Sequence, residues 1–448
     1  MRLTRRTFLG TPAAAALASP SAPQPNIVFI LADDLGYGDL GCYGQPRIQT
    51  PHLDRMAAGG TRFTQAYSGS TVCAPSRCAL MTGKHTGHAT VRGNIKPEAG
   101  LAAGETTVAG LLRRAGYRTA LFGKWGLGGP GTGSVPNTRG FDEFYGYLDQ
   151  QHAHNSYPEH LWSQQNEVFL TGNWFNRQKV YSNDQFTARA LDFIERQGAA
   201  PFFLCLTYTI PHANNELGAL TGDGIECPDD QPYSAENWPA PERKFAASIT
   251  RMDRDIGRLF EALRRKGLDD RTLVIFTSDN GPHKEGGHDT EFFHSSGPLR
   301  GTKRDLYEGG VRVPTLVRWP GRVPAGKTSD FAWAFWDFLP TAAQLAGVPA
   351  PSGIDGISVV DGLTGRAAAN RRTLYWEFHE SGFHQAVRRG NWKLVRQGPA
   401  QRVEVYDLAA DPGERSDLAA GRPAVVRELE PLFRALRVDS PRFPVRRA

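Results

Sequence analysis

The sequence predicts an α/β fold, and two observations lead to that class. Short apolar runs with the length of buried strands recur along the chain, and amphipathic helical patterns lie between them. Strands that alternate with helices form a sheet with helices on both faces. Because 448 residues exceed one ordinary hydrophobic core, we expect a large domain and a smaller one.

Four runs predict buried strands because they are short and apolar. They are residues 26–31, 118–122, 201–207 and 271–277. The clearest helix precedes the last run, where apolar residues recur at intervals of three and four between Ile249 and Leu263. Three basic residues and then Gly267 predict the C-terminal end of this helix.

Polar residues follow each of the four runs. They are Asp33-Asp34, Gly123-Lys124, Pro211-His212 and Asp279-Asn280. Open α/β sheets bind ligands at the carboxyl ends of their strands. A single Asp or Lys after a strand is often only a turn residue, but recurrence after all four runs favours one shared site.

The last part of the chain has a different pattern. From about residue 366, short alternating runs at residues 373–378, 385–388, 392–395 and 403–407 predict a small antiparallel sheet. A helical pattern follows at residues 424–436. We therefore expect a large domain at residues 24–365 and a smaller α+β domain at residues 366–448.

Residues 1–18 have the features of an export signal. Arginines precede a weakly apolar stretch that ends in the cleavage pattern Ala16-Leu17-Ala18. The pair Arg5-Arg6 followed by Phe8-Leu9 is typical of twin-arginine signals; an ordinary secretory signal is the alternative. No other stretch reaches the ~18 apolar residues of a membrane helix. We expect a periplasmic or secreted protein whose mature form has no transmembrane segment.

Charge and cysteine content exclude two further classes. The formal charge is +6, and removal of the signal with its three arginines leaves the mature chain near +3. This balance does not indicate nucleic acid binding. Five cysteines are an odd, sparse set that does not resemble a disulfide framework. Cys205 lies in an apolar run and is expected in the core.

The segment of residues 73–77, Cys-Ala-Pro-Ser-Arg, carries the strongest chemical signal. Pro75 suits the first turn of a helix, which would place Cys73 at a helix N-terminus, where backbone N–H groups favour negative charge. Arg77 lies one turn further on the same face. A reactive group at position 73 would have a cation beside it; a buried structural cysteine is the alternative.

The pattern C-x-P-S-R resembles the signature of the sulfatase family, in which this cysteine is oxidised to formylglycine. Other blocks resemble the family in the same order: residues 26–37 (NIVFILADDLGY), 123–128 (GKWGLG), 279–281 (DNG), 301–314 (GTKRDLYEGGVRVP) and 406–414 (YDLAADPGE). The resemblance implies an alkaline-phosphatase-like large mixed sheet flanked by helices, with a smaller C-terminal α+β domain that carries an antiparallel sheet. Residues 24–365 would then be the catalytic sulfatase domain.

The metal ligands implied by the resemblance are Asp33, Asp34, Asp279, Asn280 and the formylglycine made from Cys73. Hard oxygen ligands suit Ca²⁺ or Mg²⁺, and the family implies calcium. One hydroxyl of the hydrated aldehyde, polarised by the metal and Arg77, would attack sulfur, and the second would allow sulfate release. A formylglycine-generating enzyme is an implied partner.

Two lysines and a histidine are the other implied catalytic residues. Lys124 and Lys303 are expected to bind sulfate oxygens, although lone lysines are usually solvated. His212 and Lys303 are candidates to protonate the leaving alcohol.

One position departs from the family pattern. Many sulfatases have His two residues after the lysine, where this chain has Gly126. Residues 150–158 (QQHAHNSYP) supply His152 and His154, and a sulfatase subgroup combines GKWGLG with such a segment. We predict His154 as the substitute base; a loop histidine that binds sugar or nothing is the alternative.

The substrate implied by the resemblance is a sulfated oligosaccharide or polysaccharide fragment. The pattern DNGPH with GPLR resembles carbohydrate sulfatases, and the subgroup suggests galactose or N-acetylgalactosamine sulfates. Arg92, Asn94 and His379 are candidate sugar-binding residues. Two rival functions stay open: a formylglycine-dependent phosphodiesterase or phosphonate hydrolase, and a sulfated-glycan binding module with unmodified Cys73.

Overall fold

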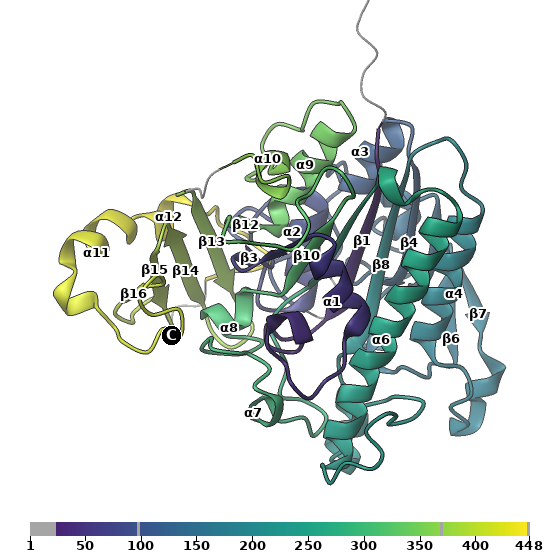
Figure 1. The fold of residues 1–448 in the computed structure, drawn as a ribbon. Helices are drawn as coiled ribbons and strands as arrows, with labels where there is room; N and C mark the ends of the chain where they lie inside the picture. Colours follow the sequence, from purple (N-terminus) through teal and green to yellow (C-terminus); the bar gives the residue numbers. More distant parts are fainter. Residues whose placement is uncertain (1–23, 96–98, 368–370, 446–448) are drawn as a thin grey trace, which may run out of the picture.

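The computed structural model describes residues 24–95, 99–367 and 371–445, so the predicted export signal at residues 1–18 lies outside the described residues. In the described chain, ten strands form one mixed sheet in the order β11-β2-β10-β9-β1-β8-β4-β5-β6-β7 (Figure 1). The strands are β11 (Lys327–Ser329), β2 (Thr61–Phe63), β10 (Thr315–Arg318), β9 (Thr272–Ser278), β1 (Asn26–Asp33), β8 (Phe202–Pro211), β4 (Arg118–Lys124), β5 (Glu143–Tyr147), β6 (His160–Ser163) and β7 (Asn166–Phe169).

The four predicted strands are the adjacent central strands β9, β1, β8 and β4, and they run parallel. The α/β prediction is therefore confirmed. Strands β10, β6 and β7 pair antiparallel and make the sheet mixed, as the family resemblance implied. A separate two-stranded ladder joins β3 (Ala66–Tyr67) to β12 (Trp333–Ala334).

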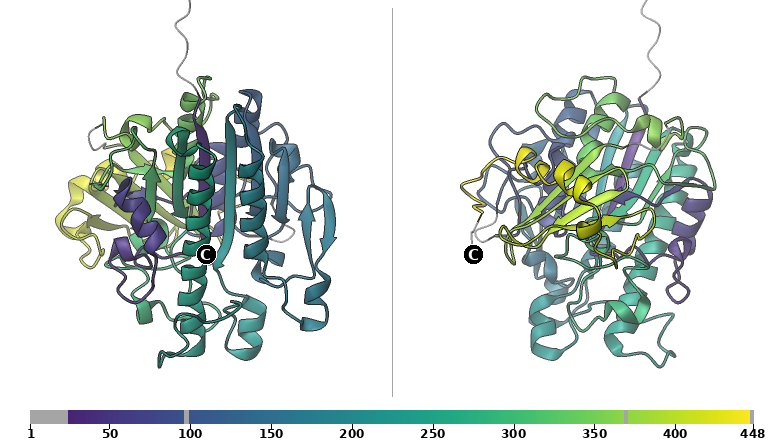
Figure 2. Two further views of the ribbon diagram at one scale, coloured as in Figure 1. Left: turned by 45° about the vertical axis from the view of Figure 1, so that its right-hand side comes forward. Right: turned by 90° about the vertical axis from the view of Figure 1, so that its left-hand side faces the viewer.

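Both faces of the central sheet are buried, because alternate side chains of each strand enter different cores. On β1, Ile27, Phe29 and Leu31 pack on one face, and Val28 and Ile30 pack on the other. Helices α1, α4 and α6 cover the second face (Figures 1 and 2). They span α1 (Pro51–Ala58), α4 (Ser182–Glu195) and α6 (Ala240–Arg265).

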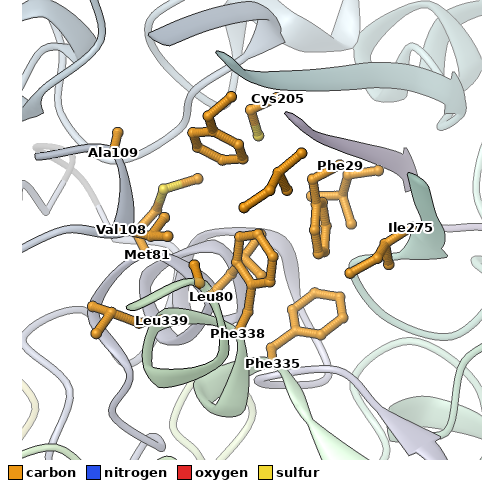
Figure 3. Close-up of a cluster of buried hydrophobic side chains, with 14 of the residues drawn as sticks. Phe29, Leu80, Met81, Val108, Ala109, Cys205, Ile275, Phe335, Phe338 and Leu339 are labelled. Carbon is orange, nitrogen blue, oxygen red and sulfur yellow. The ribbon is translucent and has the colours of Figure 1, made fainter. Parts of the chain in front are cut away.

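The first face packs against three other helices. They are α2 (Cys73–Thr82), α3 (Val108–Arg114) and α9 (Phe338–Leu345). Figure 3 shows this core, in which Phe29 and Ile275 of the sheet meet Leu80 of α2 and Phe338 of α9. Cys205 is fully buried in the same cluster, as predicted, and none of the five cysteines forms a disulfide.

The predicted helix between Ile249 and Leu263 is part of α6, which begins nine residues earlier at Ala240. Pro241 in its first turn suits a helix start, and Gly267 adopts a left-handed φ of 65° just after its end. The remaining short helices are α5 (Asn215–Thr221), α7 (Thr290–Phe293), α8 (Glu308–Val311) and α10 (Val360–Leu363). Within the described ranges, no helix is long and apolar enough to cross a membrane.

The C-terminal part forms the predicted antiparallel sheet in the order β13-β14-β15-β16. Its strands are β13 (Thr373–Phe378), β14 (His384–Arg389), β15 (Trp392–Arg396) and β16 (Glu404–Asp407). The helical pattern at residues 424–436 forms two helices, α11 (Pro423–Leu429) and α12 (Leu432–Ala435), because Pro431 lacks the N–H that would continue the first.

A buried ion cluster links this small sheet to helix α8. Lys393 of β15 places its Nζ 2.9 Å from Glu308 of α8 and 3.0 Å from Glu414. All three side chains are fully buried. Burial raises the pKa of Glu414 to about 7, whereas at Glu308 the charges of Lys393 and its arginine neighbours outweigh burial and lower the pKa to about 2. The cluster therefore depends on the lysine charge.

We expect Lys393→Met to lower the free energy of unfolding by about 3–5 kcal/mol at pH 7.5, because two buried carboxylates lose their cation. The deficit should shrink toward pH 5, since protonation of the carboxyls removes the uncompensated charge. Urea unfolding at both pH values measures this. Lys327→Met on the exposed strand β11 is the control and should change stability by less than about 0.5 kcal/mol. A pH-independent effect of Lys393→Met would contradict the ion-cluster account.

Candidate active site

The carboxyl ends of β1 and β9 bring the predicted acidic residues together. The strands pair Ala32 with Ser278, so the residues that follow them become neighbours. The backbone N–H of Asp34 donates to Asp279 Oδ1 at 3.1 Å, and that of Asp279 donates to the Ala32 carbonyl at 3.1 Å. Asn280 Nδ2 donates to Asp34 Oδ1 at 2.7 Å. The four predicted ligands other than position 73 thus lie in one buried cluster.

The backbone of Asp34 has an unusual conformation. Its φ is 67°, in the left-handed region that non-glycine residues seldom adopt. Such a conformation costs on the order of 1–3 kcal/mol and is typical of functional sites. It turns the chain out of β1 directly after Asp33, so that two consecutive carboxylates enter the same cluster.

Cys73 is the first residue of α2, as the position of Pro75 predicted. Its Sγ lies 3.2 Å from Asp33 Oδ1 and 4.0 Å from Asp34 Oδ1. Burial and the charge of Asp33 hold the pKa of this thiol well above its ordinary range. The next backbone N–H, of Ala74, donates to Asn94 Oδ1 at 3.2 Å and fixes the helix start.

Arg77 lies beneath this cluster, one turn along α2. Its Nη2 and Nε donate to Asp279 Oδ2 at 2.8 and 3.1 Å, and Nη2 lies 3.4 Å from Asp33 Oδ2. Its Nη1 donates to the Lys124 carbonyl at 2.7 Å. The guanidinium therefore orients the carboxylates of Asp279 and Asp33.

The two predicted lysines contact different carboxylates of the cluster. Lys124 Nζ lies 2.7 Å from Asp33 Oδ2, and Lys303 Nζ lies 2.7 Å from Asp34 Oδ2. Burial alone would raise the pKa of Asp33, but the charges of Lys124 and Arg77 outweigh it and hold that pKa well below the usual range. Neither lysine is a solvated surface residue.

His212 and His154 stack beside Lys303, with ring centroids 4.9 Å apart and an interplanar angle of 17°. His212 Nδ1 lies 2.6 Å from the Ala213 carbonyl and so carries a proton. Its Nε2 then faces the Lys303 ammonium at 3.2 Å. His154, on the 3-10 turn His152–His154, places Nδ1 3.0 Å from Glu216 Oε2. Burial and the charge of Lys124 lower the pKa of His154.

These groups open into a cavity of about 440 Å³, called the active-site cavity below. Cys73, His154, His212, Lys303 and Asn94 line it. Arg77 and Lys124 do not line it and lie behind the carboxylates. The remaining lining residues are Ala74, Gly93, Ile95, Ala99, Asp149, Gln150, Gln151, Asn215, Glu216, Arg304 and Glu380.

The cluster fits a hard divalent cation. Asp33, Asp34, Cys73 and His212 place their possible ligand atoms within 4.8 Å of one another. Asn280 Oδ1 is buried and has no hydrogen-bond partner among the residues that the structure describes. Burial and the neighbouring Asp33 raise the pKa of Asp279 to about 7, as expected for crowded carboxyl groups. A cation bound by oxygen ligands would relieve both the crowding and the orphaned carbonyl.

Two of the predicted sugar-binding residues have mainly structural contacts. Arg92 is buried, with Nη1 2.8 Å from Glu377 and 2.8 Å from the Val438 carbonyl, and it does not line the active-site cavity. His379 also pairs with Glu377, at 3.0 Å, and lies outside this cavity. Of the three, Asn94 is the one in the cavity wall.

The structure gives a reason for glycine at position 126. Gly126 has a φ of 69°, and a Cβ there would lie 2.2 Å from Nε2 of Gln150. Gln150 also donates to the Gly126 carbonyl at 3.1 Å and lines the active-site cavity. The side chain of Gln150 therefore fills the space beside position 126.

Sequence patterns did not identify two acidic neighbours of the site. Glu216 on α5 orients His154, and Glu285 lies 3.1 Å from Lys303 Nζ. Neither belongs to a motif with chemical meaning, and only the packing of distant segments brings them to the site.

Comparison with known proteins identifies the class. The family model described as "Sulfatase" matches residues 25–348, and one described as "N-sulphoglucosamine sulphohydrolase, C-terminal" matches residues 301–437. Human arylsulfatase A is 35% identical over 96% of this chain and 90% of its own length. The chain belongs to the sulfatase family, and it is therefore a sulfuric ester hydrolase.

Other relatives act on or bind carbohydrates by name. The dog N-acetylgalactosamine-6-sulfatase is 30% identical over 91% of this chain and 84% of its own length. The crystal structure of Ps i-CgsB in complex with k-i-k-neocarrahexaose superimposes with a TM-score of 0.79 at 28% identity, covering 92% of this chain and 93% of that one. The fold assignment is therefore confirmed, including the large mixed sheet and the C-terminal antiparallel sheet.

We expect Ca²⁺ to raise the Tm of chelator-treated protein. A ligand that binds only the folded state raises the free energy of unfolding by about 2.7 kcal/mol when its concentration is 100 times Kd. Asn280→Ala should reduce the calcium-dependent shift by at least half, since it removes the unpartnered carbonyl. Asp270→Asn, at an exposed position, should leave the shift unchanged. Differential scanning calorimetry measures the shift. Equal shifts in wild type and Asn280→Ala would exclude this residue as a ligand.

Proposed function

We propose that this sulfatase releases sulfate from a sulfated carbohydrate at a calcium-bound formylglycine formed from Cys73. The observation that carries the proposal is the position of Cys73. Its Sγ lies in the wall of the active-site cavity, at the start of α2 and 3.2 Å from Asp33. No other cysteine lines that cavity in the described chain.

Two added groups, calcium and formylglycine, would complete this site. Asp33, Asp34, Asp279 and Asn280 would hold calcium, which supplies positive charge beside the sulfate ester. Formylglycine at position 73 would supply, as its hydrate, one hydroxyl as the nucleophile and a second that allows the aldehyde to be regenerated. Arg77 keeps two of the carboxylates in place through hydrogen bonds to Asp279 and an ion pair with Asp33.

The lysines of this chain supply the remaining positive charge. Lys303 lines the active-site cavity and can contact a sulfate oxygen directly. Lys124 lies behind Asp33 and adds its charge to the same region. Such fixed cations stabilise charge that develops on sulfate oxygens during ester cleavage.

Proton transfer to the leaving alcohol comes from the pair of Lys303 and His212. Lys303 Nζ donates to Nε2 of His212 at 3.2 Å in the cavity wall, so the lysine holds the proton that passes to the alcohol, either directly or through His212. His154 acts as the base that the family places at the position of Gly126. Glu216 accepts from Nδ1 of His154, which leaves Nε2 of a neutral ring to accept a proton.

The substrate class rests on the relatives and on the cavity. One relative is named N-acetylgalactosamine-6-sulfatase, and another was crystallised in complex with k-i-k-neocarrahexaose. The lining of the active-site cavity includes the amides of Asn94, Asn215 and Gln151, and such groups suit sugar hydroxyls. We therefore propose galactose or N-acetylgalactosamine sulfates within a larger saccharide.

Maturation and export complete the proposal. A formylglycine-generating enzyme would act on Cys73, and a twin-arginine signal at residues 1–18 would then carry the folded protein to the periplasm or outside the cell. Residues 24–365 would form the catalytic domain.

The mass of the tryptic peptide of residues 63–77 tests the modification directly. Protein purified from its native host should show an aldehyde in place of the thiol at position 73 in most copies. Cys78 in the next peptide is the internal control and should stay unmodified, because it lies buried within α2 away from the cavity. A wholly unmodified Cys73 in protein that hydrolyses sulfate esters would refute the mechanism.

We expect His154→Ala to lower kcat for 4-nitrophenyl sulfate by about 10²–10⁴-fold, the usual contribution of a general base. If His154 acts after the first bond cleavage, this variant should release one equivalent of 4-nitrophenol rapidly before slow turnover. His160→Ala, a histidine outside the cavity, is the control and should keep kcat within twofold. An unchanged kcat in His154→Ala would remove His154 from the mechanism.

A further inference from the structure

A second cavity, called the outer cavity below, adjoins the active-site cavity. It has a volume of about 330 Å³. Four residues line both cavities: Gly93, Asn94, Ile95 and Glu380. The two spaces therefore share one wall, and a ligand that fills the first cavity has the second directly beside it.

Gly93 lies at the boundary between the two cavities. A Cβ at this position would lie 3.6 Å from the ring of Phe443 and 3.7 Å from Cγ of Glu380, which are ordinary contact distances. The position thus admits a small side chain without strain. Because the residue is glycine, the space between Phe443 and Glu380 stays open.

The floor of the outer cavity is held by a buried carboxylate. Glu377 is fully buried and accepts from Arg92 at 2.8 Å, His379 at 3.0 Å and Arg437 at 3.0 Å. These contacts tie the segment after α2 and the C-terminal segment to the end of β13. This explains why Arg92, a sequence-predicted sugar ligand, supports the cavity rather than lining it.

The lining of the outer cavity combines polar groups with aromatic rings. Glu380 accepts from the backbone N–H of Asn94 at 2.7 Å through Oε1, and its Oε2 is a further acceptor. His379 contacts Glu377 through Nε2, so Nδ1 is the ring nitrogen left for a ligand. The rings of Phe383 and Phe443 contribute apolar surface, and Arg442 contributes a cation. A lining of apolar rings with a few polar groups is typical of a small-molecule site.

We propose that the outer cavity is a second saccharide subsite, which binds the sugar unit attached to the sulfated one. The proposal rests on the carbohydrate sulfatase function proposed above. It makes the preferred substrate an oligosaccharide of at least two units, with the sulfated unit in the active-site cavity. Hydroxyl groups of the second unit would meet Glu380, His379 and Arg442, and its apolar face would lie on Phe383.

The test compares three substrates: 4-nitrophenyl sulfate, galactose 6-sulfate, and a disaccharide with the same sulfated galactose at its end. Wild-type protein should show a kcat/KM at least tenfold higher for the disaccharide than for the monosaccharide. Arg442→Ala and Phe383→Leu should each lower disaccharide kcat/KM at least fivefold. Both should keep the values for the two smaller substrates within twofold. Arg322→Ala, an exposed arginine outside both cavities, is the matched control.

A second pair of variants examines the passage between the cavities. Gly93→Leu should abolish the disaccharide preference, because its side chain would enter the space between Phe443 and Glu380. Gly93→Ala should keep the preference, because a single methyl fits at ordinary contact distance.

The possible results distinguish a failure of the second subsite from a failure of the carbohydrate sulfatase function. Equal kcat/KM for monosaccharide and disaccharide in the wild type would overturn the subsite and leave the carbohydrate sulfatase function standing. Losses in Arg442→Ala and Phe383→Leu that are equal for all three substrates would also overturn it, because they would indicate a structural role. Hydrolysis of 4-nitrophenyl sulfate without hydrolysis of either sugar would refute the carbohydrate assignment itself.

Discussion

Three buried carboxylates at the carboxyl edge of β1 and β9 impose the constraint on which the site depends. Asp33, Asp34 and Asp279 are fully buried, and like charges so close would oppose folding if nothing offset them. The chain offsets them with Arg77, Lys124 and Lys303, three cations that come from separate segments. Of these cations, Lys303 also lines the cavity in which we propose that the anionic ester binds, so the same charge would serve both stability and function.

The parallel sheet explains why these groups meet. Parallel strands end at a common edge, and the register of β1 with β9 puts Asp33-Asp34 beside Asp279-Asn280. Strands β4 and β8 deliver Lys124 and His212 to the same edge. The helix that follows residue 72 then places Cys73 over the carboxylates. Asp33, Lys124 and Cys73 thus lie in regular elements and His212 lies directly after one, whereas Lys303 lies in a turn.

Much of this arrangement was predictable from sequence, and the reasons are physical. The four central strands are buried on both faces, so their apolar runs are long and distinct, and the polar residues after them point to one edge. The short outer strands β6 and β7 were not predicted, because they are partly exposed and carry mixed residues. Glu216 and the Arg92–Glu377 pair depend on contacts between distant segments, for which a single sequence has no local signal.

The central claim is that sulfate ester hydrolysis depends on Cys73 and on no other cysteine. Sulfate release from 4-nitrophenyl sulfate by Cys73→Ala and Cys78→Ala, both produced in a host that matures sulfatases, tests it most directly. Both cysteines lie in α2, so damage to the helix would affect the two variants alike. The account predicts no detectable turnover in Cys73→Ala and turnover within about threefold of wild type in Cys78→Ala. Comparable activity of Cys73→Ala and wild type would contradict it.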